Sequence, residues 1–173
     1  GLSGGIDSAL VAALAVDALG SEKVHAIFMP SAYTSRLSFD CAEKLAANLG
    51  IDMRTHHIDE LVRPYQVDAP FLAEGGTAAE NLQARIRGMI LMALSNKFGA
   101  IVLSTGNKSE MACGYATLYG DMCGGYAPIK DLYKTEVFSL ARWRNEQGIG
   151  NGESGIGKPA SQTIPAEVIS RPP

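Results

Sequence analysis

The chain has 173 residues, of which 46% are hydrophobic and 19% charged, a balance typical of a folded protein with a sizeable core. Its 15 basic and 18 acidic residues give a formal charge of -3 and form no basic stripe, so nucleic acid is not an expected partner. The three cysteines have no Cys-x-x-Cys spacing, which argues against a zinc site and favours a reducing, cytoplasmic location. No apolar run approaches the roughly 18 residues of a membrane span, so no membrane partner is expected.

Apolar periodicity predicts alternating helices and strands in the first half of the chain. Gly1-Leu2 has the pattern of the end of a strand whose start lies upstream, which suggests a fragment of a longer chain. The expected elements then follow as a helix over 8–19 stopped by Gly20, a buried strand over 24–29, a helix over 35–49, a weaker strand over 53–58 and a long surface loop over 59–76.

The second half continues the alternation. A capping-box pattern over 77–80 predicts the start of a helix that runs to about Lys97. Further expectations are a strand over 100–104, a short helix over 107–113, an irregular loop over 114–133, a helix over 135–144 with Trp143 as a packing residue, and a mobile tail after Gln147. Short apolar strands between helices predict an α/β fold, a doubly wound parallel sheet with helices on both faces, in one domain over 1–173.

Polar clusters follow the expected strands at three places: 3–8, 29–38 and 104–110. Because ligands of parallel sheets bind beyond the carboxyl ends of the strands, these clusters are expected at one binding edge. The first cluster, with two glycines before a helix, suits a cradle of backbone N–H groups for phosphate. The alternative is a turn in which Asp7 or Ser8 caps a helix.

Asp7 stands in a loop that lacks the lysine of a Walker loop, and a carboxylate beside phosphates suggests bound Mg²⁺. Glu110, after another strand, is the candidate second ligand. The alternative is that both carboxylates only favour the starts of their helices.

Several other patterns are set aside. The Gly-x-x-x-x-Gly-Lys match over 152–158 and the Gly-x-Gly-x-x-Gly match over 150–155 follow no strand and open no helix. His56-His57 would point to opposite faces of a strand and has no third ligand at metal spacing. Cys113 and Cys123 have no evident partner for a cysteine nucleophile.

Ser3-Gly4-Gly5-Ile6-Asp7-Ser8 resembles the Ser-Gly-Gly-x-Asp-Ser loop of the ATP pyrophosphatase superfamily. That loop alone does not separate NAD synthetase from GMP synthetase, asparagine synthetase or tRNA-modifying members. Later segments resemble NAD synthetase in order and spacing, namely those at 80–87, 104–110, 119–122 and 129–135. The segments beginning at Gly114 and Leu140 resemble the glutamine-dependent type.

The resemblance implies a Rossmann-like fold of the ATP pyrophosphatase type and a set of site residues. ATP would be bound by Ser3, Gly4, Gly5, Ile6, Asp7, Ser8, Thr105 and Lys134; deamido-NAD by Asn81, Arg85, Glu110 and Asp121; Mg²⁺ by Asp7 and Glu110. Asp7, Asp121 and Lys134 would be catalytic. The deamido-NAD site would be shared across a homodimer or larger homo-oligomer.

The implied reaction is the ATP-dependent amidation of deamido-NAD to NAD⁺ through an adenylate, releasing AMP and pyrophosphate. Ammonia would come from glutamine through an upstream glutaminase domain, which this chain lacks. The chain also stops at Pro173, before a hydroxyl residue and an acidic residue that the family usually places next. The rivals are another amidating ligase such as GMP synthetase, and a non-catalytic adenine-nucleotide-binding module.

Overall fold

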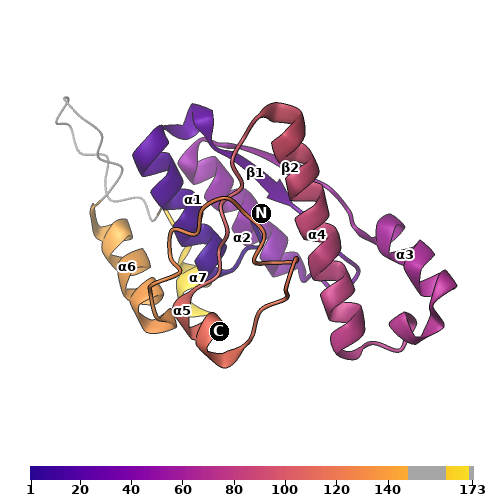
Figure 1. Cartoon of the computed structure of the whole chain (residues 1–173). Coiled ribbons are helices and arrows are strands. Elements are labelled where there is room, and N and C mark those ends of the chain that lie inside the picture. Colours follow the sequence, from indigo (N-terminus) through magenta and orange to yellow (C-terminus); the bar gives the residue numbers. More distant parts are fainter. Residues whose placement is uncertain (148–162, 172–173) are drawn as a thin grey trace.

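The computed structural model describes residues 1–147 and 163–171, and a small parallel sheet lies at its centre (Figure 1). Strand β1 (His25–Phe28) pairs in parallel with β2 (Asp52–Thr55). The carbonyl of Phe28 accepts from His56 N–H on the β2 side, whereas that of Ile27 accepts from Leu2 N–H at 2.9 Å. Successive carbonyls of a strand point to opposite sides, so Leu2 extends the sheet on the edge of β1 away from β2.

Helices cover both faces of this sheet, and the side chains of β1 show it. Ala26 and Phe28 belong to one buried cluster, while Ile27 and Met29 belong to another. The first cluster includes residues of α1, α2, α6 and α7, and the second residues of α3 and α4. The described helices are α1 (Ile6–Leu19), α2 (Arg36–Leu49), α3 (Asp59–Asp68), α4 (Gly76–Phe98), α5 (Lys108–Cys113), α6 (Lys134–Gln147) and α7 (Ala166–Ser170), with 3-10 turns η1 (Ser21–Lys23) and η2 (Pro70–Ala73). The predicted α/β fold is confirmed.

The boundaries of the early elements follow from local chemistry. Helix α1 ends at Gly20, as predicted. Helix α2 begins after Ser35, whose hydroxyl accepts from Ser38 N–H at 3.2 Å, and it ends at Gly50 in the left-handed conformation. The strand predicted over 24–29 is β1, and the weaker one predicted over 53–58 is shifted to β2.

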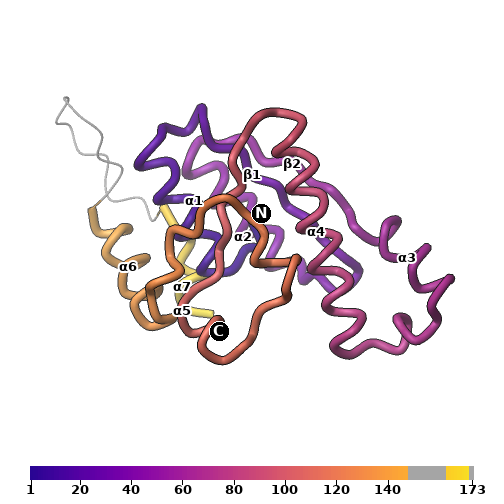
Figure 2. Tube along the Cα trace, in the orientation of Figure 1, coloured from indigo at the N-terminus to yellow at the C-terminus, as the bar shows by residue number. Residues whose placement is uncertain are grey.

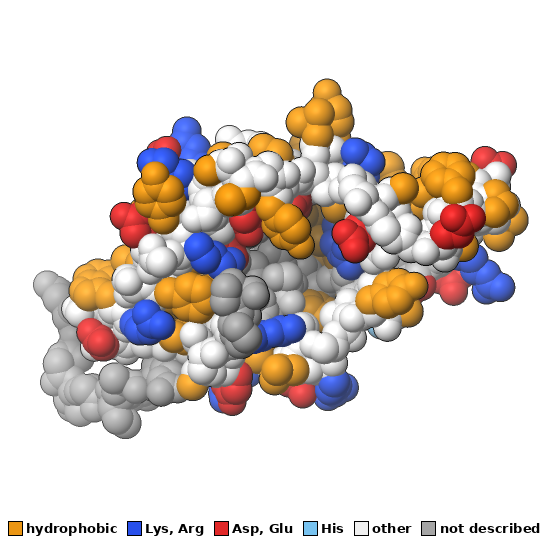
Figure 3. Space-filling model, turned by 90° about the horizontal axis from the view of Figure 1, so that it is seen from below, with side chains coloured by type: hydrophobic (Ala, Val, Ile, Leu, Met, Phe, Trp, Pro, Cys, Tyr) orange, Lys and Arg blue, Asp and Glu red, His pale blue; other side chains and the backbone are white. Residues whose placement is uncertain are grey.

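The surface loop predicted over 59–76 is wrong, because this segment contains α3 and η2. Pro64 lies inside α3, where its ring removes one backbone donor. Burial of Ile58 and Val62 against the α4 residues Ile86 and Leu82 compensates for that loss. Exposed hydrophobic side chains remain on α3 and η2, and Figure 3 shows a group of them over this projecting end, with charges of both signs interspersed over the face in view.

Two expectations for the next segment are also wrong. Helix α4 begins at Gly76, and no side chain caps it, so Thr77 lies inside the helix and the capping box does not form. The strand predicted over 100–104 is reduced to a single parallel bridge between Leu103 and Tyr126. Its pairing partner is an irregular loop, and Ile101 is 62% exposed, so this apolar run is not the buried strand that its composition indicated.

Predictions for the C-terminal third have mixed outcomes. Helices α5 and α6 match the predicted ones, and the irregular loop over 114–133 is confirmed (Figure 2). Trp143 is 52% exposed, so its expected packing role is wrong, and Arg144 is the buried residue at this end of α6. The two glycine-rich matches and most of the predicted mobile tail lie outside the described residues. Among the described helices, none has the length and hydrophobicity to cross a membrane.

An ion pair between Asp17 and Arg144 joins α1 to α6. Arg144 Nε and Nη2 donate to the two carboxylate oxygens of Asp17 at 2.5 and 2.6 Å, and the Arg144 side chain is only 6% exposed. A bidentate hydrogen bond between a carboxylate and a buried guanidinium is strong and sensitive to geometry.

We expect Asp17→Asn to lower the free energy of unfolding by about 2 to 3 kcal/mol, because it removes the charge that compensates a desolvated guanidinium. Asp40→Asn, at an exposed pair with Arg36, should cost less than about 0.5 kcal/mol. Urea denaturation measures both. Equal losses for the two variants would show that burial of Arg144 adds nothing to its pairing.

Candidate functional site

The glycine loop before α1 is closed by two serine hydroxyls. Ser8 Oγ accepts from Ser3 N–H at 3.1 Å and donates to the Gly5 carbonyl at 3.1 Å, while Ser3 Oγ accepts from Gly5 N–H at 3.2 Å. Gly5 is the N-cap residue, and no side chain caps α1. The alternative in which Asp7 or Ser8 caps the helix is therefore wrong. The first-turn N–H groups, which lack intrahelical acceptors, remain available to an anion.

Gly4 is the position at which this loop requires glycine. Its φ is +80°, and a Cβ atom there would lie 2.2 Å from the carbonyl oxygen of Ser38. The loop thus lies directly against the first turn of α2. A side chain at this position would force the loop away from α2 and change the direction of its N–H groups.

The Asp7 carboxylate is the point at which three distant segments of the chain meet. Its Oδ1 accepts from Asn107 Nδ2 at 2.8 Å, and its Oδ2 accepts from Lys134 Nζ at 2.5 Å. The side chains of Asp7 and Lys134 are 16% and 25% exposed, so the pair is largely shielded from water. Lys134 opens α6, and its N–H donates to Ser109 Oγ of α5 at 3.0 Å. Asp7 thereby ties the starts of α1, α5 and α6 together.

Asn107 is fully buried and joins the two predicted metal ligands, Asp7 and Glu110. It forms a capping box with Glu110: Glu110 N–H donates to Asn107 Oδ1 at 3.0 Å, and Asn107 N–H donates to Glu110 Oε2 at 3.1 Å. The sequence interpretation placed Asn107 only at the start of a helix. An Asn three residues before a Glu is the pattern of a capping box and was a usable signal. The bond to Asp7 spans 100 residues and carries no local signal.

Burial raises the pKa of Glu110. The hydrogen bond from Asn107 N–H opposes this shift, and the negative charge of Asp7 adds to it. Because the folded-state pKa lies above the ordinary glutamate value, ionisation of Glu110 opposes folding. That cost grows as the pH rises from the ordinary value to the raised one, and it vanishes below both. A nearby cation would relieve it.

A cavity of about 160 Å³ lies between the glycine loop and the segment after α5. It is lined by Ser3, Asp7, Ser8, Thr105, Gly106, Glu110, Met111, Ala116, Asp121 and Met122. Six of these are predicted site residues, and Gly106, Met111, Ala116 and Met122 are additions from the structure. Lys134 reaches the same place through Asp7.

The other predicted residues do not line this cavity. Asn81 and Arg85 lie on α4 and form hydrogen bonds with the loop over 114–121: Asn81 Oδ1 accepts from Thr117 Oγ1, and Arg85 Nε donates to the Leu118 carbonyl. The Ile6 side chain is 5% exposed and belongs to the core, so only its backbone is available to a ligand.

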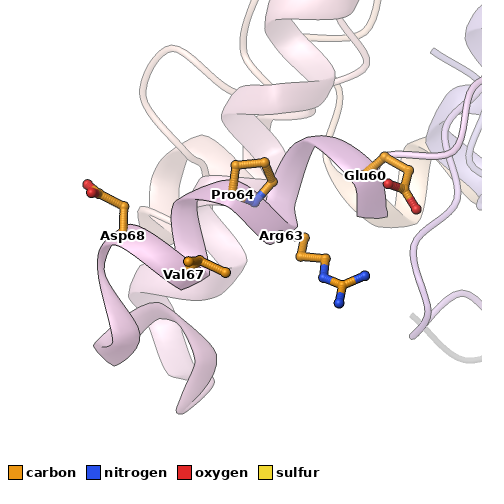
Figure 4. Close-up of a pocket in the computed structure, with 5 residues that line it drawn as sticks. All are labelled: Glu60, Arg63, Pro64, Val67 and Asp68. Carbon is orange, nitrogen blue, oxygen red and sulfur yellow. The ribbon is translucent and has the colours of Figure 1, made fainter.

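A larger cavity, of about 550 Å³, lies on α3 (Figure 4). Its lining residues Glu60, Arg63, Pro64, Val67 and Asp68 all come from this one helix, and their side chains splay apart in the close-up. Within the described part of the chain, no side-chain hydrogen bond or ion pair joins any two of these five residues. The smaller cavity, where separate segments bring carboxylates and a lysine together, is therefore the candidate site.

The donor set of that site suits magnesium with few protein ligands. Nowhere among residues 1–147 and 163–171 do three or more His, Cys, Asp or Glu side chains gather as a metal cluster. Asp7 and Glu110 supply two carboxylates, and Mg²⁺ commonly takes one or two of these together with phosphate oxygens.

The histidine pair and the cysteine set aside in the sequence do not belong to this donor set. His56 and His57 are exposed after the end of β2. Burial raises the pKa of the Cys123 thiol, which disfavours a nucleophilic thiolate.

Comparison with known proteins places this geometry in a family. Residues 1–173 match the family model described as NAD synthase. The chain belongs to the NAD synthase family. It is 57% identical over 176 residues to a glutamine-dependent NAD(+) synthetase of Xanthomonas campestris pv. campestris, a match that covers 100% of this chain and 30% of that protein. The chain therefore spans less than a third of the length of this curated relative.

Solved structures of NAD synthase relatives share the fold. The glutamine-dependent NAD+ synthetase of Acinetobacter baumannii, solved with adenosine diphosphate, is 48% identical, with a TM-score of 0.87 over 98% of this chain and 31% of that one. The NMN synthetase of Francisella tularensis is 27% identical, with a TM-score of 0.80 over 99% of this chain and 63% of that one.

Replacing Gly4 tests the geometry of the glycine loop. We expect Gly4→Ala to lower the free energy of unfolding by about 3 kcal/mol or more, because it adds a clash with Ser38 to an unfavourable φ. Gly114→Ala is the matched control, since Gly114 also has a positive φ, of +70°, but open space around it, and it should cost about 1 kcal/mol. Chemical denaturation would contradict the expectation if both variants lost the same amount.

Asn107 offers a second stability test. We expect Asn107→Ala to cost about 3 kcal/mol, because it removes both the helix cap and the charge-assisted bond to Asp7. Asn107→Ser keeps a capping oxygen but cannot reach Asp7, so it should recover about 1 kcal/mol of that loss. Denaturation of the two variants separates the contributions, and a neutral Asn107→Ala would mean that the bond to Asp7 adds no stability.

Proposed function

We propose that the protein containing this chain converts deamido-NAD to NAD⁺, using ATP and ammonia and releasing AMP and pyrophosphate. One observation carries the proposal: Asp7, next to the glycine loop, forms an ion pair with Lys134, and Asn107 links it by hydrogen bonds to Glu110. This arrangement suits the charge of a departing pyrophosphate. Membership of the NAD synthase family and 57% identity to a glutamine-dependent NAD(+) synthetase support deamido-NAD as the substrate.

ATP is the proposed co-substrate at the glycine loop. Ser3, Gly4, Gly5, Ile6 and Ser8 would hold its phosphates, mainly through backbone N–H groups and the two hydroxyls. Thr105, which lines the same cavity, would contact ATP from the opposite side. The adenosine diphosphate complex of the Acinetobacter baumannii relative supports nucleotide binding in this fold.

Asp7 and Glu110 are the proposed ligands of Mg²⁺, which when bound would offset the negative charge of the phosphates. Lys134 would add a second positive charge. In the described structure Lys134 pairs with Asp7, so its ammonium group is held beside the glycine loop before any nucleotide binds. Such preorganised charge costs no rearrangement during the reaction.

The chemistry then needs alignment more than proton transfer. The nicotinate carboxylate, already an anion, attacks the α-phosphorus of ATP, and the bond to the pyrophosphate oxygen breaks. Ammonia next attacks the carbonyl carbon of the acyl adenylate, loses a proton, and AMP leaves. Lys134 would stabilise the departing pyrophosphate, and Asp121, on the cavity wall, would orient or deprotonate the incoming ammonium.

The deamido-NAD site and the rest of the protein would extend beyond the cavity. Asn81, Arg85, Glu110 and Asp121 would contact deamido-NAD, within a site shared between copies in a homodimer or larger homo-oligomer. Residues 1–173 would form one synthetase domain, supplied with ammonia by a glutaminase domain elsewhere in a longer, cytoplasmic protein. The length of the Xanthomonas campestris relative, of which this chain matches 30%, supports further domains.

Three rival functions make different predictions. A GMP-synthetase-like ligase would amidate xanthosine monophosphate, and an enzyme like the NMN synthetase of the same fold would prefer nicotinate mononucleotide. A nucleotide-binding module would bind ATP without releasing pyrophosphate.

Pyrophosphate release by the full-length protein with ATP, Mg²⁺ and ammonia distinguishes these functions. We expect rapid release with deamido-NAD and at least about 100-fold less with xanthosine monophosphate or nicotinate mononucleotide, because an enzyme aligns only its own acceptor carboxylate. Asp7→Asn should lower kcat at least about 100-fold, the cost of losing one electrostatic group in a shielded site. Asp40→Asn, at an exposed ion pair, is the control and should leave kcat unchanged. Preference for another acceptor would overturn the proposal.

A further inference from the structure

The loop after α5 lies directly on α4, because glycine at two positions lets the backbones approach closely. A Cβ atom at Gly88 of α4 would lie 2.9 Å from the Gly120 carbonyl oxygen. A Cβ atom at Gly120 would in turn lie 3.0 Å from Cβ of Ala84 on α4. The backbone around Gly120 is therefore in direct contact with α4, and a side chain at either glycine would push the two apart.

Thr117 makes hydrogen bonds that reach two of the predicted substrate-binding side chains. Its hydroxyl donates to Asn81 Oδ1 of α4 at 2.7 Å, and its backbone N–H donates to Asp121 Oδ1 at 2.7 Å. Its carbonyl accepts from Gly120 N–H at 2.9 Å, which closes the turn between them. Thr117 thus joins a helix residue to a loop residue that lines the cavity, without lining the cavity itself.

The bond from Thr117 decides what Asn81 offers to a ligand. An asparagine amide has one acceptor oxygen and one NH₂ donor group. The oxygen accepts from Thr117, and within the described part of the chain the NH₂ group has no partner. Asn81 therefore presents a donor, which suits a phosphate, carboxylate or carbonyl oxygen.

The same residue decides the orientation of Asp121. One carboxylate oxygen of Asp121 is held by Thr117 N–H, which leaves the other oxygen as the acceptor. Next to Thr117, the Leu118 carbonyl accepts from Arg85 Nε at 3.2 Å, so this stretch of loop also sets the direction of that guanidinium. We infer that Thr117 is a positioning residue for deamido-NAD, which leaves the Asn81 NH₂ group as a hydrogen-bond donor and fixes the orientation of the Asp121 carboxylate. This inference rests on the proposed function.

The role of the Thr117 hydroxyl is tested in the full-length protein with the Thr117→Val variant, which keeps the methyl group and the backbone N–H. We expect the KM for deamido-NAD to rise about ten-fold, the effect of about one hydrogen bond, with kcat and the KM for ATP within about two-fold of wild type. Thr117→Ser restores the hydroxyl and should return the KM for deamido-NAD to within about two-fold. Thermal unfolding reports whether each variant folds, and Thr117→Ala replaces the valine variant if that one does not.

A double-mutant cycle with Asn81→Ala tests whether Thr117 affects deamido-NAD binding through Asn81. If Thr117 acts through Asn81, adding Thr117→Val to Asn81→Ala changes the KM for deamido-NAD by less than about two-fold. An unchanged KM in Thr117→Val, a failure of serine to restore it, or an equal rise in the KM for ATP would overturn the positioning role. Absence of deamido-NAD turnover in the wild-type protein would instead overturn the proposed function, and this inference with it.

Discussion

The carboxylate of Asp7 is the constraint on which the candidate site depends. It is mostly buried, and it accepts one hydrogen bond from Asn107 and one from Lys134, which lie 100 and 127 residues further along the chain. A shielded carboxylate is costly unless such donors satisfy it. The starts of α1, α5 and α6 are therefore held where their polar groups face one cavity. The same pairing that stabilises the fold also stores a positive and a negative charge where phosphate chemistry would need them.

Each part of the site is supported by a neighbouring contact with a different purpose. The glycine loop depends on close packing against α2 at Gly4, and Glu110 depends on the capping box that starts α5. The loop over 114–121 depends on Gly88, which lets it lie on α4. Close backbone approach, a helix cap and a buried ion pair are ordinary elements of stability. Here they also set the direction of the groups that would contact a nucleotide.

Several sequence predictions failed where a local rule did not decide the structure. Proline favours a loop, yet Pro64 lies in a helix because Ile58 and Val62 bury their side chains against α4. The pattern at Thr77 fits a capping box, yet the helix begins one residue earlier, at Gly76, so Thr77 cannot act as its cap. Apolar composition favoured a strand at 100–104, but this segment pairs with a neighbouring segment only at the bridge between Leu103 and Tyr126. At Pro64 the decisive partners lie on α4, distant in the sequence, and leave no local pattern.

The sequence by itself determined the α/β alternation and the glycine loop, and it indicated Asp7, Glu110, Asp121 and Lys134 as candidate site residues. These depend on periodicity, on glycine chemistry and on motifs that are contiguous in the chain. Only the tertiary structure showed that Asn107 joins Asp7 to Glu110 and that Thr117 forms hydrogen bonds with both Asn81 and Asp121. An asparagine or threonine has many possible partners, and which one it meets is decided by how the elements pack.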